Sequence, residues 1–196
     1  MSEHNIVNEG DKYGNIWITS RTRMQSHARI KSYDLLSHVV LTFYSVTLLA
    51  FSVFADHLTN THLGPYTSEV SIVLSLSVLC ASLVIWGLKF SKTADEHRDC
   101  YLALQRLYED HQAREDKANY IKILDRYPNH TDFDFETMLY RNIWRQGKTM
   151  DDRRGPISFG IGRVVSYWLI SGIRIMIGAA LLLFPMLFLG LLYAFG

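Results

Sequence analysis

Histidine, cysteine and acidic side chains gather in two places where their spacing could support chemistry. His97 and Cys100 lie one helical turn apart, and His111 follows in the same charged stretch. A complete structural zinc site usually needs four ligands, and the sequence has no CxxC or HExxH motif to supply them. The second place, 129–132 (NHTD), pairs an imidazole with a carboxylate, but local helix capping explains it better than catalysis. We therefore expect no metal site, no cofactor and no enzymatic activity.

Polar side chains inside two apolar runs are more informative. In the first run five of them recur on one narrow helical face: His38, Thr42, Ser45, Ser52 and Asp56. In the second run Ser71, Ser75 and Ser82 share a face. Because polar groups are costly against hydrocarbon, we expect both faces to turn toward protein or water. They could form hydrogen bonds between helices or line a conduit when several copies assemble, and the pattern fits both uses.

The elements that carry these faces are charge-free runs of membrane-spanning length. Residues 35–55, 70–88 and 175–196 contain no Asp, Glu, Lys or Arg, whereas 89–163 holds 14 of the 20 basic and 13 of the 19 acidic residues. A helix needs about 20 apolar residues to cross the bilayer core. The sequence therefore predicts an all-α membrane protein: a two-span hairpin over 34–90 (spans about 35–55 and 70–90), cytoplasmic helices, and a third C-terminal transmembrane helix.

Two further segments complete the predicted layout, which begins with a basic N-terminal segment over 1–33. Residues 163–196 form the third helix, whose first part, 163–174, is either an interfacial run-in or the start of one longer, tilted helix. The region 91–162 is helical, with helices over 91–118, 112–125 and 133–146 and a linker over 148–162. Along 91–118 an apolar seam with spacings of three and four could join subunits or pack within one: Ala94, His97, Tyr101, Leu104, Tyr108 and His111.

Charge sets the orientation and limits the partners. Arg21, Arg23, Arg29 and Lys31 precede the first run and lysines follow the second, but the loop 56–69 has no Lys or Arg. This bias predicts a cytoplasmic N-terminus, an external 56–69 loop and a periplasmic C-terminus for three spans. The net charge of +1 argues against direct nucleic-acid binding. Two cysteines make no disulfide framework, and no signal peptide is evident.

The order of these elements resembles the SLATT family of membrane effector domains, which are associated with SMODS and SLOG proteins. The likeness rests on Arg29, the run 33–54, Lys89-Phe90, Ala94, His97-Arg98 and Tyr101. The stretch 120–132 (YIKILDRYPNHTD) looks like a family signature, with Tyr120, Tyr127, Asn129, His130 and Asp132 as its distinctive members. It is similar to the branch found beside reverse transcriptases, including retron-like operons.

The resemblance implies a toxic effector of bacterial anti-phage defence in the inner membrane. Such an effector oligomerises and permeabilises the membrane, causing abortive infection when a partner sensor releases or triggers it. The sensor would be a reverse transcriptase with its non-coding RNA, or a nucleotide-signal system. The alternative is a non-conducting membrane anchor or scaffold for a cytoplasmic partner, which would be harmless when expressed alone.

Overall fold

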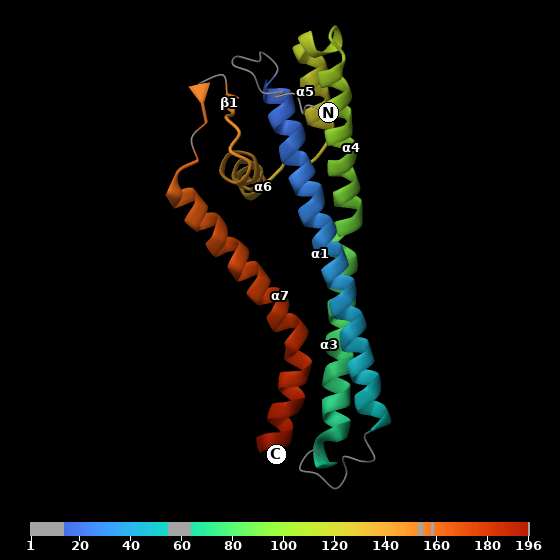
Figure 1. Cartoon of the computed structure of the whole chain (residues 1–196). Coiled ribbons are helices and arrows are strands. Elements are labelled where there is room, and N and C mark those ends of the chain that lie inside the picture. Colours follow the sequence, from blue (N-terminus) through green and yellow to red (C-terminus); the bar gives the residue numbers. More distant parts are fainter. Residues whose placement is uncertain (1–13, 55–63, 153–154, 158, 196) are drawn as a thin grey trace, which may run out of the picture. The chain divides into compact units, whose positions relative to one another are not determined.

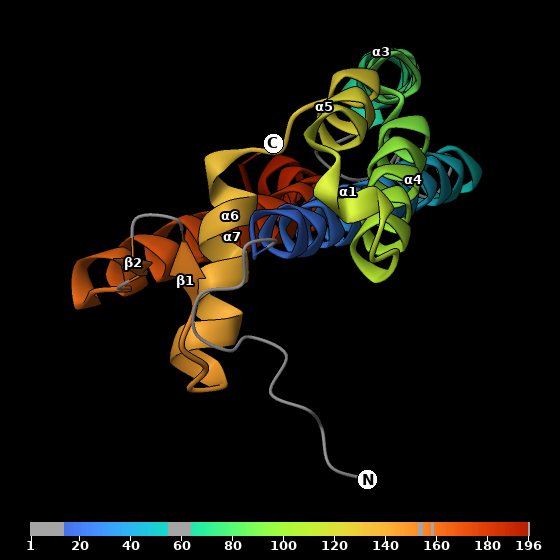
Figure 2. The same ribbon diagram turned by 90° about the horizontal axis from the view of Figure 1, so that it is seen from above.

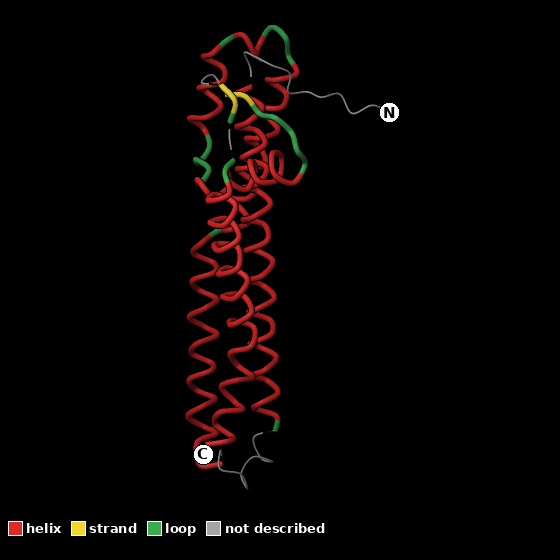
Figure 3. The backbone as a smooth tube through the Cα atoms, turned by 60° about the vertical axis from the view of Figure 1, so that its left-hand side comes forward, coloured by secondary structure: helices red, strands yellow, loops and turns green. Residues whose placement is uncertain are grey.

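The computed structural model describes residues 14–54, 64–152, 155–157 and 159–195, and almost all of its regular structure is helical. The longer helices are α1 (Gly14–Val53), α3 (Thr67–Leu88), α4 (Phe90–Glu109), α5 (Lys117–Arg126), α6 (Asp132–Leu139) and α7 (Ile161–Phe195). Short helical turns complete the set: η1 (Gly64–Tyr66), η2 (Ala113–Glu115) and the π-helical η3 (Tyr140–Arg145). Two two-residue strands, β1 (Asp151–Asp152) and β2 (Gly155–Pro156), pair antiparallel and are yellow in Figure 3. The predicted all-α class is confirmed.

The chain divides into two compact units. The polar unit comprises residues 1–31 and 91–171, and the membrane unit comprises 32–90 and 172–196. Helices α1 and α7 each contribute one end to the polar unit and the other end to the membrane unit. Each unit is therefore built from segments that are far apart in the sequence.

In the polar unit α1 and α4 form an antiparallel pair, coloured blue and green in Figure 1. Ser20 donates a hydrogen bond to the carbonyl of Tyr101 at 3.2 Å, and His27 Nδ1 donates to the carbonyl of Ala94 at 2.9 Å. Seen from above, α1 lies between α4 and α6 (Figure 2). The N-terminal part of α1 is therefore the central helix of this unit.

Two apolar clusters flank that central helix. The first contains Met138, Leu139, Met150, Phe159 and Val164, with Trp17 and Ile18 of α1 packed against it. The second contains Ile16, Cys100, Leu104 and Leu107, and side chains of α5 pack around it. Burying apolar side chains on both sides of α1 contributes on the order of 1.5–3 kcal/mol for each fully buried residue.

The membrane unit holds the apolar parts of three helices. Among the described residues, the structure has three helices long and apolar enough to cross a membrane, and only 11% of the most apolar stretch of each is buried. α1 and α3 contact each other through Phe51, Val70 and Leu74, with Leu48 beside them. Most of the remaining apolar side chains face outward, as expected where lipid replaces water as the solvent. Since α1 has 40 residues, only its apolar C-terminal half is needed to span the bilayer.

Several predicted boundaries in the charged region are wrong. The helix expected over 91–118 ends at Glu109, because the Asp110 carboxylate accepts hydrogen bonds from the backbone N–H groups of Gln112 and Ala113 and so caps a new turn. The next helix begins at Lys117, not at 112, with Asp116 as its N-cap. In contrast, the bounds of the helix expected over 133–146 are right to within a residue, and Gly147 follows it at φ 65°, but its last part is the π-helical turn η3.

A single residue, Lys89, separates α3 from α4. Lys89 adopts the left-handed conformation, with φ 49° and ψ 40°. A non-glycine residue rarely takes this conformation, because its Cβ crowds the backbone. The break at Lys89 lies next to the boundary between the two units, which falls after Phe90.

The segment 163–174 continues into the third helix without interruption, as the longer-helix alternative expected. Two residues in the first turns of this helix contact other residues of the polar unit. Arg163 pairs with Glu136 at 3.9 Å, and Tyr167 stacks on Tyr140 with ring centroids 4.3 Å apart.

Candidate functional site

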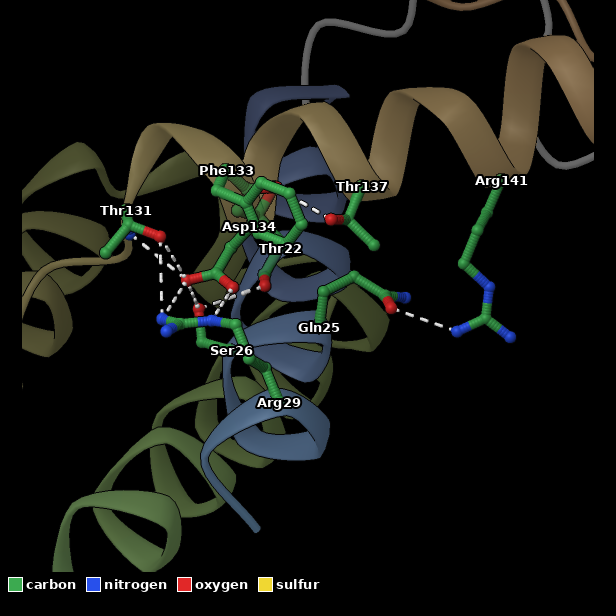
Figure 4. Close-up of polar contacts among 9 residues, drawn as sticks. All are labelled: Thr22, Gln25, Ser26, Arg29, Thr131, Phe133, Asp134, Thr137 and Arg141. Carbon is green, nitrogen blue, oxygen red and sulfur yellow. Dashed lines mark hydrogen bonds and ion pairs between the residues drawn. The ribbon is translucent and has the colours of Figure 1, made fainter. Parts of the chain in front are cut away.

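A buried ion pair joins α1 to α6 in the polar unit. Arg29 donates to Asp134 through Nε at 2.7 Å and through Nη2 at 2.9 Å, so the contact is bidentate. The Asp134 carboxylate is only 1% exposed. Ser26 and Thr131 each donate a hydroxyl hydrogen bond to it at 2.8 Å, as Figure 4 shows. This carboxylate is therefore fully enclosed by hydrogen-bond donors.

Local sequence explains where these groups lie on their own helices. Thr131 is the N-cap of α6, and Asp134, three residues later, accepts from the backbone N–H of Thr131 at 3.2 Å. This is the acidic half of a capping box, in which the third helical residue reaches back to the cap. On α1, Ser26 and Arg29 are separated by three residues and so share one helical face. Asp134 thus accepts a hydrogen bond from the N-terminus of its own helix and also binds α1.

Electrostatics keeps Asp134 ionised. Burial alone would raise the pKa of this carboxyl, but the hydrogen bonds from Arg29 and Ser26 and the charge of Arg29 lower the pKa below its usual value. A permanently ionised, enclosed carboxylate cannot exchange protons with a substrate near neutral pH. The arrangement suits a structural contact between α1 and α6 better than acid–base catalysis. Below, this contact is called the clamp, and it consists of Asp134 with Ser26, Arg29 and Thr131.

A second contact between the same two regions lies one turn away. Arg141 of η3 donates to the side-chain carbonyl of Gln25 at 3.0 Å (Figure 4). This contact is solvent-exposed, so it adds little stability compared with the enclosed pair. It does fix how η3 lies along α1.

Unpartnered nitrogens surround the clamp. Arg23 is 1% exposed, and its Nη2 donates to Asn129 at 3.3 Å, but its Nε and Nη1 are buried without a hydrogen-bond partner. The Nδ1 atoms of His97 and His130 are also buried and unpartnered. Burial, together with the charge of Arg23, lowers the pKa of His97 to about 4 and also lowers the pKa of His130. Both imidazoles are therefore neutral at pH 7.

The residues considered first for chemistry do not form a reactive centre. Cys100 is buried, and burial raises the pKa of its thiol, which disfavours the reactive thiolate. Within the described part of the chain, no three His, Cys, Asp or Glu side chains gather as metal ligands would. His111 lies in the turn after α4 and is exposed, away from the helix that carries His97 and Cys100.

Two of the distinctive residues of the 120–132 stretch, Tyr120 and Asn129, contact α1. The Tyr120 hydroxyl hydrogen-bonds with that of Thr19 at 2.9 Å, Asn129 accepts from Arg23, and His130 is half-buried nearby. Tyr127 packs at the edge of the second apolar cluster. Asp132 is exposed in the first turn of α6. The stretch thus positions the start of α6 beside α1.

The predicted seam on 91–118 is largely occupied within the chain. Ala94, His97 and Leu104 are buried, Tyr101 and Tyr108 are half-buried, and the exposed His111 lies beyond the end of α4. The ring of Tyr101 contacts that of His27 edge to face, with centroids 6.0 Å apart. These contacts match the alternative in which the seam packs inside one subunit.

The polar face of the first span is exposed. Thr42, Ser45 and Ser52 are exposed, and His38, also exposed, pairs with Asp34 at 3.7 Å. Ser45 donates to the carbonyl of Leu41 in its own helix. Asp56, the fifth predicted member, lies outside the described residues. These four side chains, called the α1 polar face below, do not contribute to the described α1–α3 cluster.

The serines of the second span bond back to their own helix. Ser71 donates to the carbonyl of Thr67 at 2.8 Å, Ser75 to that of Ser71 at 2.7 Å, and Ser82 to that of Leu79 at 2.8 Å. A hydroxyl satisfied in this way can face lipid at reduced cost. Their shared face therefore needs no partner helix.

Sequence reasoning missed the residues at the centre of the clamp. Asp134 fell within the helix predicted over 133–146 without being singled out, and Ser26 was not singled out either. Arg23 was used only as a positive charge that sets orientation. The usable local signal was the Thr131–Asp134 spacing of a capping box, which marks the start of α6.

Fold and site together define a helical membrane protein in which a clamped polar unit accompanies three apolar helices. A family model described as SMODS and SLOG-associating 2TM effector domain family 5 matches residues 9–187, and the chain belongs to this family. The match extends over all three candidate spans, although the description counts two. No curated protein and no solved structure shows significant similarity to the chain.

Proposed function

We propose that this protein is a membrane effector of bacterial anti-phage defence that assembles from several copies and permeabilises the inner membrane. A partner sensor releases or triggers it, and the breach causes abortive infection. Its membership in a family of effector domains supports this proposal, as do its three candidate spans. It acts by assembly in the bilayer and carries out no covalent chemistry.

The observation that carries the proposal is the exposed α1 polar face. α1 contacts α3 through Leu48 and Phe51 and contacts α7 through Tyr44, whereas His38 and Ser45 remain exposed. An imidazole exposed along an apolar stretch is costly against hydrocarbon unless protein or water covers it. Assembly of several copies around this face would supply that cover and line a water-filled path.

The construction of the polar unit supports the proposed orientation. Residues 14–31 and 91–171 pack into one unit, so the chain between them must cross the membrane an even number of times. The basic residues on both sides of the hairpin favour the cytoplasm for this unit. With α7 as a third span, the C-terminus is periplasmic.

The family description points to proteins with SMODS or SLOG domains as a class of sensor partner. The likeness of 120–132 to the reverse-transcriptase-associated branch favours a reverse transcriptase with its non-coding RNA as the other candidate. In either case the polar unit is the part that meets the partner. Direct nucleic-acid binding by this chain is not required.

The test replaces three members of the polar face together, Thr42→Leu, Ser45→Leu and Ser52→Leu. Expression in a bacterium should then leave membrane potential and dye exclusion intact, whereas the parent depolarises the cell, alone or with its neighbouring genes. The matched control Val39→Leu, Val46→Leu and Val53→Leu adds similar bulk to an adjacent exposed face of α1 and should leak like the parent.

Leakage by the triple Leu variant at the parent rate would contradict the polar face as the conducting surface. Normal potential for the parent in every gene combination, despite confirmed insertion, would favour the alternative of a non-conducting membrane anchor. Both variants should be recovered in the membrane fraction at the parent level, since every substitution is apolar.

A further inference from the structure

Pro185 leaves one carbonyl of α7 without its normal helical partner. In an α-helix the carbonyl of residue 181 accepts from the N–H of residue 185, and proline has no N–H. Pro185 lies inside α7 and is buried. An unpaired carbonyl in an apolar stretch costs several kcal/mol in lipid, so another donor is needed there.

Tyr44 of α1 supplies that donor. Its hydroxyl donates to the carbonyl of Leu181 at 2.8 Å. A tyrosine hydroxyl in the middle of an apolar span also needs a hydrogen-bond partner. The two groups satisfy each other, and the bond links helices whose bonded residues are 137 positions apart in the sequence.

A second contact shows how the two helices run. A Cβ placed on Gly178 would lie 3.5 Å from Cδ2 of Leu36, so α7 approaches α1 closely at this glycine. Leu36 precedes Tyr44 on α1, as Gly178 precedes Leu181 on α7. The two contacts therefore follow the same order along both helices, and α1 and α7 run parallel in the membrane unit.

We propose that Tyr44 is a positioning residue that docks α7 onto α1 through the carbonyl freed by Pro185. Pro185 leaves the Leu181 carbonyl without a backbone donor, and the Tyr44 hydroxyl donates to this carbonyl instead. This makes α7 a third integral helix of the membrane unit. The inference does not depend on whether the assembled protein permeabilises membranes.

If Tyr44 acts through the carbonyl freed by Pro185, the effect of replacing Tyr44 should depend on whether Pro185 is present. Cross-linking can measure this dependence. In a background with Cys80→Ser and Cys100→Ala, the substitutions Leu36→Cys and Gly178→Cys place thiols at the point of close approach. The rate at which a short bis-methanethiosulfonate joins them in membranes reports whether α7 is docked. This parent should cross-link readily.

Tyr44→Phe should slow the reaction about five-fold, the factor expected for one hydrogen bond of ordinary strength. Pro185→Ala restores a backbone N–H for Leu181, so Tyr44→Phe added to Pro185→Ala should change the rate less than two-fold. The control Tyr66→Phe, in the exposed turn before α3, should not change the rate.

Equal slowing by Tyr44→Phe in the proline and alanine backgrounds would overturn the pairing with Pro185. No slowing in the proline background, or no cross-linking in the parent, would overturn the docking role. Because all variants are compared by cross-linking in membranes, loss of permeabilisation does not affect the result.

Discussion

The polar unit and the membrane unit place opposite kinds of residue in their interiors and on their surfaces. The polar unit encloses a carboxylate, a guanidinium and an imidazole, while the membrane unit exposes leucine, isoleucine and valine along most of each helix. The comparison teaches that the exposure of a side chain does not by itself tell which solvent it meets. What counts as a stable exterior depends on the solvent that each unit meets.

Breaking the clamp should produce the largest change in the polar unit. Asp134→Asn removes the charge that compensates Arg29 and weakens the cap of α6. Removing one partner of a buried ion pair typically costs about 3–5 kcal/mol, and we expect about 3 kcal/mol here because Arg29 is partly exposed. Chemical unfolding of the detergent-purified chain, followed by circular dichroism, measures it.

Asp132→Asn is the matched control, because it changes an exposed carboxylate in the same helical turn. It should alter the free energy of unfolding by less than about 0.5 kcal/mol. Equal effects of the two variants would mean that Asp134 acts only as a helix-terminal charge and not as a clamp.

Replacing an exposed apolar residue by arginine should have different consequences in the membrane unit and in the polar unit. Leu83, 60% exposed in α3, and Ile121, 44% exposed in α5, are both surface residues of the isolated chain. Leu83→Arg should disfavour insertion by about 2.5–3.5 kcal/mol, whereas Ile121→Arg should be tolerated. Alkaline carbonate extraction of membranes compares them. If both variants stayed in the membrane fraction equally, Leu83 would not face lipid in the way that the prediction requires.

The polar unit should also lose stability in mild acid. His97 has a folded-state pKa of about 4, below the value of 6.5 expected when unfolded. The unfolded state therefore binds more protons between these pH values. The stabilisation of the folded state that arises from neutral His97 is complete above pH 6.5 and is lost as the pH falls toward 4. The slope approaches about 1.4 kcal/mol per pH unit for each such histidine.

The charged and titratable neighbours of His97 are Arg23, Arg29, His130 and Asp134. His130 shifts in the same direction and adds to the slope. Asp134 contributes only at lower pH, because its pKa lies below 3.8. Unfolding measured from pH 7.5 to 4.5 should show a shallower slope in His97→Gln and an unchanged slope in His111→Gln. A parent slope near zero would contradict the prediction.

Local sequence was enough to predict the membrane unit. The charge-free runs at 35–55 and 70–88 predicted spans, and the structure has helices there that end at Val53 and Leu88. Insertion into lipid depends mainly on the length and composition of each run, which can be read without knowing its partners. The third run was predicted in the same way.

The polar unit was harder to predict, because its stability depends on pairs that are distant in the sequence. Arg29 and Asp134 are 105 residues apart, and no local pattern indicates that they meet. Helix ends were also set by competing side-chain contacts, as at Asp110, where a carboxylate capped a turn inside the helix predicted to run to 118. The link between Tyr44 and Leu181 was missed for the same reason.

The distance in sequence between Arg29 and Asp134 also sets the order of folding. At about 5–20 residues per second, Arg29 is added to the growing chain roughly 5–20 s before Asp134. The capping box stabilises the first turn of α6, but the polar unit can close only after both hairpin helices have been made. In the proposed topology these helices return the chain to its starting side. Closure of the clamp is therefore a late step, which a chain with only one of the two hairpin helices inserted cannot complete.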